Sequence, residues 1–405
     1  MDGSPTMTEQ LALYGGKPVR ASLLPYGKQW ISEEDIEAVV QILRGDFLTT
    51  GPAIDQFEQA VAKYVGANYA VTFSNGTAAL HGAVFAAGIA EGDEVITTPM
   101  TFAASANCVL YQKGRPVFAD IEPMTGNIDP ETIEDIITSK TRAIILVDYT
   151  GRPVEIDKIR RIAEKYGLII IEDAAHAFGA SYKGVRVGTL SDMTMFSFHP
   201  VKHITTGEGG IIVTNSAEYY ERLRLFRSHG ITKDPSKWSK DEGPWYHEMQ
   251  CLGYNYRMTD IQAALGVSQL QKSDDFLMRR RQLVNQYREG LTSLEGVILP
   301  PQDVEGESSW HLFVIQLELE KLMVGRREVF EALQAENIGV NVHYIPVYHH
   351  PYYMRMDYRP KCPQVEQFYE RIITLPLFPA MTDQDLQDVV RALRKVLTFF
   401  KVNSK

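Results

Sequence analysis

The chain has 405 residues, which is too long for one simple hydrophobic core and predicts a large domain joined to a smaller one. Its 41 basic and 51 acidic side chains give a formal net charge of −10, which argues against nucleic acid or an anionic membrane as a partner. Three scattered cysteines lack the spacing of a metal site and suit a reducing compartment: Cys108, Cys251 and Cys362.

The first ten residues lack the apolar core of a secretory signal. The first ten, MDGSPTMTEQ, are polar, and no later stretch approaches the roughly twenty apolar residues of a membrane helix. We therefore expect a cytoplasmic protein without membrane contact. Residues 1–31 are predicted to form an irregular N-terminal arm, rich in glycine and proline from residue 11, that is either a disordered end or a strap across a partner.

A helix is predicted to follow the arm. Ser32 has the character of an N-cap, and apolar residues recur at helical spacing from Ile36 to Leu43, so the helix should end near Arg44. The segment DFLTTGP at 46–52 then reads as a turn.

Strand and helix patterns alternate through the next part of the chain. Short apolar runs lie at 69–74, 93–98, 116–119, 143–149 and 168–173, and helical patterns lie at 77–88, 101–112, 130–138 and 155–166. This alternation indicates an α/β domain with a mostly parallel sheet covered on both faces, which we place at residues 32–270. Ligands of such sheets bind beyond the carboxyl ends of the strands.

Two of these strand ends carry candidate ligand contacts. In SNGTAAL (74–80) a strand passes through Gly76 into a helix at Thr77, and a helix N-terminus suits a phosphate, although the same pattern also describes an ordinary turn. Phe102 lies just inside the next predicted helix, where it either joins the core or stacks on a ligand ring.

A carboxylate and a lysine come next in the chain. Asp173 ends the buried run LIIIED, where a carboxylate is costly unless it faces a positive group, although a satisfied structural carboxylate is the alternative. Lys202 lies in SFHPVKHITTGEGG (197–210), beyond a predicted strand at 193–199. The interval of about thirty residues allows one hairpin between them, so both side chains can face one cleft. Alone, Lys202 would be read as a surface lysine.

Together these groups match the needs of pyridoxal 5′-phosphate. A lysine amine bonds to its aldehyde, and a carboxylate keeps its pyridine nitrogen protonated so that the ring accepts electrons. The helix start at Gly76 suits the phosphate, and Ser197 can add a hydroxyl to it.

Several segments resemble one family, the sugar-nucleotide aminotransferases, a branch of the fold type I pyridoxal phosphate enzymes. They are DAAHA (173–177), SFHPVK (197–202), TTGEGG (205–210), NYRMTDIQAALG (255–266) and SNGTAAL. The resemblance extends from residue 11 to residue 383. Within the family, the segments at 25–32, 45–52, 225–231 and 342–353 look most like the aminotransferases of pseudaminic acid biosynthesis.

The resemblance implies a role for individual residues. Lys202 matches the catalytic lysine that bonds to the cofactor, and Asp173 matches the partner of the pyridine nitrogen. The other positions matching cofactor contacts are Gly76, Thr77, Phe102, His176, Ser197 and Asn255, of which Asn255 is inserted from the neighbouring subunit in the family. A homodimer with shared active sites is therefore expected. Positions on the substrate side match Tyr26, Phe47, Leu48, Thr49, His343 and Tyr344.

The implied function is transfer of an amino group from L-glutamate to the C-4 ketone of a UDP-4-keto-6-deoxy-N-acetylhexosamine. Alternatives are transfer to another nucleotide-linked 4-keto-6-deoxy sugar, a cofactor-dependent sugar dehydratase, and a non-catalytic regulatory relative. Dehydratases of this family carry histidine at the lysine position. Here the histidine comes one place later, at His203, while FHPVK keeps Lys202 in register, which disfavours a dehydratase.

The remaining sequence predicts a smaller α+β domain at residues 271–405. Helical spacing runs from 259 to 291, strands are expected at 308–319 and 338–345, and helices at 326–337, 363–372 and 382–400. The tyrosine and histidine cluster at 343–353 has no carboxylate or cysteine at ligand spacing, so we expect no metal there.

Overall fold

A seven-stranded sheet forms the centre of the molecule in the computed structural model, which describes residues 9–303, 306–356, 358 and 360–402. The strand order is β1-β9-β8-β5-β4-β2-β3. The strands are β1 (Tyr69–Phe73), β2 (Glu94–Thr97), β3 (Arg115–Phe118), β4 (Thr141–Val147), β5 (Ile169–Asp173), β8 (Met193–Ser197) and β9 (Gly210–Thr214). All neighbours pair in parallel except β9, which is antiparallel to both β1 and β8. The predicted mostly parallel sheet is confirmed; β9 was not foreseen.

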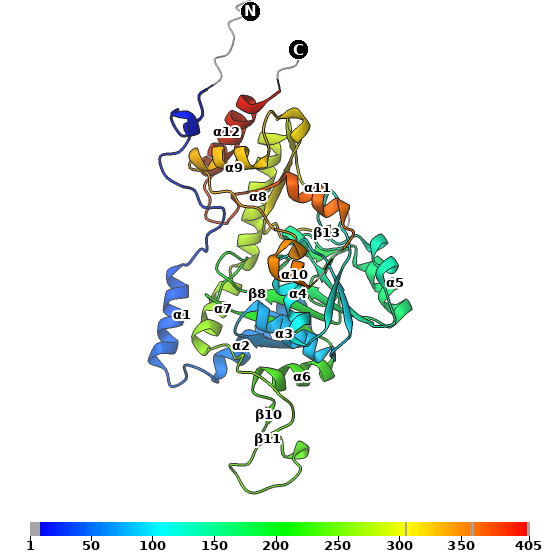
Figure 1. The fold of residues 1–405 in the computed structure, drawn as a ribbon. Coiled ribbons are helices and arrows are strands. Elements are labelled where there is room, and N and C mark those ends of the chain that lie inside the picture. The colour runs from blue at the N-terminus through cyan, green and yellow to red at the C-terminus, as the bar shows by residue number, and fades with distance from the viewer. Residues whose placement is uncertain (1–8, 304–305, 357, 359, 403–405) are drawn as a thin grey trace, which may run out of the picture.

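Helices cover both faces of this sheet (Figure 1). They are α2 (Pro52–Val65), α3 (Gly76–Ala86), α4 (Ala104–Tyr111), α5 (Ile156–Tyr166), α6 (Ala217–Arg227) and α7 (Asp260–Leu270). Successive side chains of β4 alternate between two cores, because strand side chains point to opposite faces. Ala143 and Ile145 join the cluster around α3, whereas Ile144 and Leu146 join the cluster around α5. This double burial explains why the strand sequences are almost continuously apolar.

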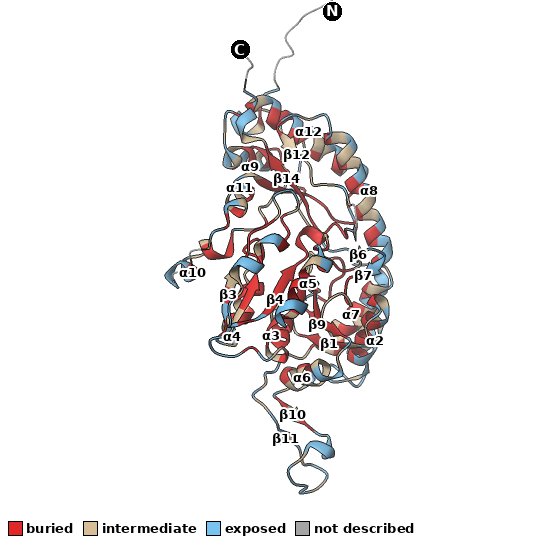
Figure 2. Ribbon diagram, turned by 90° about the vertical axis from the view of Figure 1, so that its right-hand side faces the viewer, coloured by how far each residue is buried: buried red, intermediate tan, exposed pale blue. Residues whose placement is uncertain are grey.

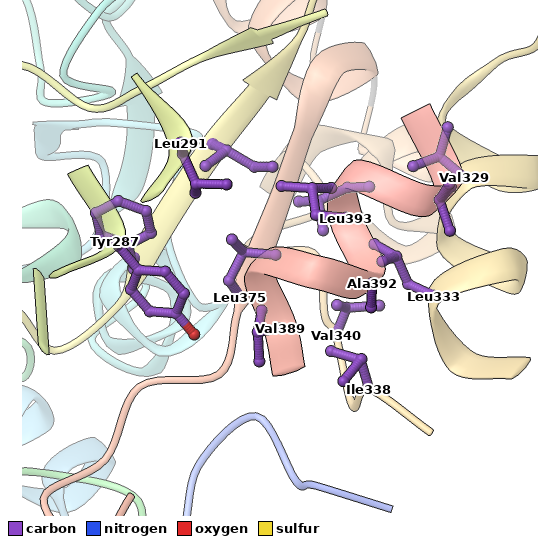
Figure 3. Close-up of a cluster of buried hydrophobic side chains, with 14 of the residues drawn as sticks. Tyr287, Leu291, Val329, Leu333, Ile338, Val340, Leu375, Val389, Ala392 and Leu393 are labelled. Atoms are coloured by element: carbon purple, nitrogen blue, oxygen red, sulfur yellow. The ribbon is translucent and has the colours of Figure 1, made fainter. Parts of the chain in front are cut away.

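A second, smaller group of elements lies above the sheet in Figure 1. Its strands are β12 (Val297–Ile298), β14 (Phe313–Leu317) and β15 (Ile372–Leu375), and its helices are α8 (Ser273–Leu291), α9 (Arg326–Ala335), α11 (Pro363–Arg371) and α12 (Asp383–Phe400). Side chains of α8, α9, α12 and β15 form one buried cluster, shown in Figure 3. The expected α+β character is present; the boundary at residue 270 stays a prediction.

The N-terminal arm packs on this smaller group. Leu11 and Leu24 are buried in its core, and Leu24 pairs with Ile338. The arm then leads into α1 (Glu33–Arg44), which begins with the capping box of Ser32 and Asp35. Residues 1–8 of the predicted arm lie outside the described residues.

The remaining elements are short. They are the hairpin β6 (Ser181–Tyr182) and β7 (Val185–Arg186), β13 (Gly306–Glu307) beside β6, the pair β10 (Ile231–Thr232) and β11 (Glu248–Met249), and α10 (Pro351–Arg355). The β6–β7 hairpin is the excursion expected between Asp173 and Lys202. The segment carrying β10 and β11 projects from the body, as Figure 2 shows.

Three sequence predictions were wrong in detail. Residues 130–138 form two single 3-10 turns, at Pro130–Thr132 and Glu134–Ile136, instead of a helix. The helical stretch 259–291 is broken, because Lys272 leaves helical geometry between α7 and α8. Residues 338–345 form no strand and make only isolated bridges; β15 takes the place beside β14 and buries all four of its side chains.

No helix in the described ranges combines the length and apolar character needed to cross a bilayer.

Candidate active site

A cavity of about 980 Å³ opens beyond the carboxyl ends of β4 and β5. The sheet side contributes Val147, Asp173 and the start of α3, and the facing side contributes Tyr26 and the segment 341–345. The position agrees with the rule that parallel sheets bind ligands at their carboxyl edge.

Lys202 lies in the turn that follows β8. Its backbone N–H donates to the carbonyl oxygen of His199 (2.9 Å), and its Nζ lies 3.5 Å from Nε2 of His311. Burial lowers the pKa of Lys202 to about 8; the negative charge of Asp173 opposes this shift, and the positive charge of Arg280 adds to it. A large share of the amine is therefore neutral at mildly alkaline pH, as a nucleophile requires.

Asp173 ends β5 and is buried. Ser105 Oγ donates to its Oδ2 (2.6 Å), and the N–H of Ala175 donates to its Oδ1 (3.2 Å). Burial nevertheless raises the pKa of Asp173, because two hydrogen bonds do not replace its lost hydration. A cationic ligand group beside this carboxylate would restore its preference for the charged form.

Two further carboxyl groups are buried near Asp173: Glu172 precedes it in β5, and Asp148 follows β4 and donates its backbone N–H to the Asp173 carbonyl (3.2 Å). Asp148 accepts from the N–H of Val154 (3.0 Å), and Glu172 accepts from Thr194 Oγ1 (2.8 Å). Burial raises the pKa of both, and the negative charge of Glu172 raises that of Asp148 further. Both shifts disfavour the charged forms of this pair, which limits the negative charge behind Asp173.

The N-terminus of α3 meets the end of β8. Asn75 caps the helix through Oδ1, which accepts from the N–H of Ala78 (2.8 Å). A Cβ at Gly76 would lie 3.2 Å from Cβ of Ser197, so glycine permits this close approach. The helix start and the Ser197 hydroxyl thus form one small anion-binding corner.

His176 supplies a buried ring nitrogen without a partner. Its Nε2 lies 2.9 Å from Tyr344 Oη, while its Nδ1 has no hydrogen-bond partner among the described residues. Burial lowers the pKa of His176 far below its ordinary value, so the ring is neutral. Phe102 lies at the cavity with 60% of its surface exposed, and its ring centre is 6.2 Å from that of Tyr344. An aromatic ligand with a polar edge fits between these groups.

The structure brings ten of the fourteen predicted site residues to this cavity: Tyr26, Gly76, Thr77, Phe102, Asp173, His176, Ser197, Lys202, His343 and Tyr344. The other four, Phe47, Leu48, Thr49 and Asn255, are exposed and do not line it. Thr49 pairs with Thr259, and the Leu48 carbonyl accepts from the N–H of Asp260, so the 47–49 turn adjoins the segment that follows Asn255. These four residues do not contribute to the cavity of their own chain.

Sequence reasoning missed His311 and Arg280. His311 precedes β14 and is buried against Lys202, and its ring centre lies 4.4 Å from that of His176. The available signal was a histidine inside the apolar, strand-like segment 308–319. Arg280 gave no signal, because it follows Arg279 and precedes Arg281 on an amphipathic helix. Within the described residues, no group of three or more histidine, cysteine or acidic side chains is arranged to hold a metal.

Comparison with known proteins identifies the family of this chain. The model of the DegT/DnrJ/EryC1/StrS aminotransferase family matches residues 29–394. The chain belongs to this family. It is 40% identical to the spore coat polysaccharide biosynthesis protein SpsC of Bacillus subtilis over 381 residues, which cover 93% of this chain and 98% of SpsC.

Solved structures of the family agree with the fold. The aminotransferase PseC of Helicobacter pylori, involved in the biosynthesis of pseudoaminic acid, superposes with a TM-score of 0.88 at 32% identity over 94% of this chain and 100% of that chain. The pyridoxal phosphate form of the putative sugar aminotransferase Spr1654 of Streptococcus pneumoniae gives a TM-score of 0.87 at 29% identity over 93% and 99%.

The protein is therefore a pyridoxal phosphate-dependent sugar aminotransferase of fold type I, as the sequence predicted. The residues present fit the cofactor: a buried carboxylate, an amine with a lowered pKa, an anion-binding helix start and an unpaired histidine nitrogen surround one cavity. When bound, pyridoxal phosphate supplies an aldehyde for amines and a ring that accepts electrons.

Proposed function

We propose that this aminotransferase moves an amino group from L-glutamate to the C-4 ketone of a UDP-4-keto-6-deoxy-N-acetylhexosamine, in a pathway of the pseudaminic acid type. The observation that carries the proposal is the cavity itself, which joins Lys202 and Asp173 on one wall to Tyr26, His343 and Tyr344 on the other. The likeness to PseC supports this choice of sugar, and so does the resemblance of the segment 342–353.

Lys202 is proposed as the group that moves protons. Its amine, with a pKa near 8, can accept the α proton of the amino donor at Nζ and later return a proton to the substrate side. Asp173 holds positive charge at the base of the cavity, and Ser197 with the N-terminus of α3 holds the phosphate. His176 orients Tyr344 through the 2.9 Å contact between Nε2 and Oη.

The substrate wall is neutral. Burial and the nearby Lys202 lower the pKa of His343 to about 3, and its Nδ1 lies 2.8 Å from Thr374 Oγ1. Burial keeps Tyr344 protonated by raising its pKa. Neutral hydrogen-bonding groups of this kind suit hydroxyl and acetamido groups of a sugar.

The test uses the purified protein loaded with pyridoxal phosphate. Addition of L-glutamate should convert the aldehyde form of the cofactor to its amine form, and a 4-keto-6-deoxy sugar nucleotide should convert it back; both steps are followed by absorbance. A panel of UDP- and dTDP-linked sugars separates the preferred substrate from its relatives. Lys202→Ala should abolish both conversions. Consumption of the sugar without an amino donor would instead identify a dehydratase.

We further propose a homodimer in which Asn255 and the turn at 47–49 complete the site of the neighbouring subunit. Their exposure and their distance from the cavity of their own chain support this arrangement. Asn255→Ala and Lys202→Ala proteins should each be impaired. Mixing them after mild dissociation should restore activity at about a quarter of the sites, from random pairing of two chains in a symmetric dimer. No recovery in verified mixed dimers would contradict a shared site.

A further inference from the structure

Arg280 of α8 is a buried cation without an acidic partner among the residues that the structure describes. Only 1% of its surface is exposed. Its Nη1 donates to the carbonyl oxygens of Trp310 (3.2 Å), His311 (3.2 Å) and Leu377 (3.0 Å). Burial lowers its pKa to about 9, which leaves the guanidinium charged at neutral pH. Burying a charge without a counter-ion costs several kcal/mol, so its presence here calls for a reason.

The carbonyls that Arg280 binds belong to a strained corner. Trp310 has a φ of 49°, in the left-handed region that bulky residues rarely enter. Such strain persists only where surrounding contacts enforce it, and Arg280 binds the carbonyls of Trp310 and the next residue. The corner places the His311 ring against Lys202, with Nε2 3.5 Å from Nζ. Arg280 therefore contacts the backbone of His311, and the His311 ring in turn contacts the Lys202 amine.

The charged and titratable groups around Lys202 come from several elements. Asp173 lies at the end of β5, and four histidines are grouped nearby: His176, His203, His311 and His343. Burial lowers the pKa of every one of these histidines, so they are neutral. The positive charges among these groups at neutral pH are then those of Arg280 and the largely protonated Lys202. Burial is the main cause that lowers the pKa of Lys202, His203 and His311, and the charge of Arg280 adds to it.

We propose that Arg280 is a positioning residue of the active site: its hydrogen bonds hold the corner that places the His311 ring against Lys202, and its fixed positive charge disfavours protonation of both side chains. Hydrogen bonds to the three carbonyls offset part of the free-energy cost of desolvating the guanidinium. They leave its positive charge in place, whereas a carboxylate partner would cancel that charge. The inference rests on the proposed role of Lys202 and is independent of the sugar.

The experiment uses the full chain loaded with pyridoxal phosphate and three variants: Arg280→Met, Arg280→Lys and Arg279→Met. Arg279 is the matched control, because it neighbours Arg280 on α8 but bonds to Asp383 (2.9 Å) and to the Met381 carbonyl (2.7 Å) near the surface. Two quantities are measured for each protein: the thermal midpoint, and the pH at which the absorbance of the bound cofactor changes.

Arg280→Met should shift that pH midpoint upward, because removal of a nearby positive charge makes protonation of Nζ easier. Arg280→Lys, which keeps the charge, should stay close to the parent protein, and Arg279→Met should not shift. A lowered thermal midpoint with an unchanged pH midpoint would overturn the proposal and leave Arg280 a purely structural role. If Arg280→Met fails to fold, Arg280→Gln replaces it and the same outcomes decide. Absence of any bound cofactor in the parent protein would instead reject the proposed function.

Discussion

The two walls of the cavity are built in different ways. The cofactor wall uses the ends of regular elements: Asp173 ends β5, Ser197 ends β8, and Gly76 begins α3. The substrate wall uses Tyr26 and the segment 341–345, which belong to no helix or strand. A strand end is fixed by its ladder of hydrogen bonds, whereas an irregular segment must be held by individual tertiary contacts.

One buried ion pair anchors the arm that carries Tyr26. Glu336 follows α9, and its Oε1 lies 2.9 Å from Nζ of Lys395 on α12. The same carboxylate accepts from the backbone N–H groups of Ala12 and Val19, each at 2.8 Å. Further along the arm, the Tyr26 carbonyl accepts from the N–H of Leu377. The position of Tyr26 therefore depends on contacts between segments far apart in the sequence, whereas Asp173 and Ser197 are positioned by the strands that they end.

Glu336→Gln should have the largest effect, because it leaves the buried Lys395 ammonium with only the exposed Glu9 carboxylate, 4.0 Å away, as a counter-ion. We expect the free energy of unfolding to fall by about 3–5 kcal/mol, measured by chemical denaturation. Glu331→Gln is the control, since Glu331 forms an exposed pair with Arg327 on the same helix (2.9 Å) and should cost no more than about 0.5 kcal/mol. Equal losses in the two variants would show that the buried pair does not anchor the arm.

Asp173→Asn tests the cofactor wall. The amide is nearly isosteric but cannot hold positive charge, so the rate of the half-reaction with L-glutamate should fall by roughly 10²–10³-fold, the usual cost of removing one preorganised electrostatic partner. Stability should change little, because burial already disfavours the charged carboxylate. Stopped-flow absorbance measures the rate, with Asp157→Asn, an exposed carboxylate on α5, as control. A rate within a few fold of the parent would exclude Asp173 from the chemistry.

The sequence predicted the cofactor wall far better than the substrate wall, for a physical reason. Asp173 and Lys202 are recognisable because Asp173 ends one buried apolar strand and Lys202 follows another, and the sheet rule then places them together. The strand expected at 338–345 failed because its apolar residues, such as Ile338 and Val340, are buried in the core of the smaller group without a ladder partner. A periodic apolar pattern indicates which side chains are buried, and here these side chains are buried without forming a strand.

Residues brought in by long-range packing were hardest to predict. His311 reaches Lys202 only because the corner at Trp310 turns it there, and nothing in the local sequence encodes that corner. Four residues present the reverse case, because they were predicted for the site but do not line the cavity of their own chain: Phe47, Leu48, Thr49 and Asn255. Their assignment came from a resemblance between motifs, which implied the neighbouring subunit's site for Asn255 but did not say which subunit's cavity the 47–49 turn completes.

The pH dependence of cofactor attachment tests the environment of Lys202. Only the neutral amine attacks an aldehyde, and burial places its pKa at about 8 in place of the ordinary 10.5. The rate at which cofactor-free protein bonds to pyridoxal phosphate should therefore rise about tenfold per pH unit below this pKa and level off above it. This rate is measured by spectrophotometry from pH 6 to 10. A rate that still climbs steeply above pH 9 would mean that Lys202 is not desolvated.

Tyr26→Ala should have the smallest effect and the most selective one. The Tyr26 ring lies 5.3 Å from that of His343, and an aromatic contact of this kind contributes about 0.5–1.5 kcal/mol, so KM for the sugar nucleotide should rise roughly two- to tenfold. The half-reaction with L-glutamate should keep its rate, because the cofactor wall is untouched. Tyr14→Ala is the matched control: Tyr14 lies in the same arm, exposes 51% of its surface and packs on Phe399 of α12. If Tyr26→Ala slowed both half-reactions equally, the two walls would act as one unit, and the separation of chemistry from specificity would not hold.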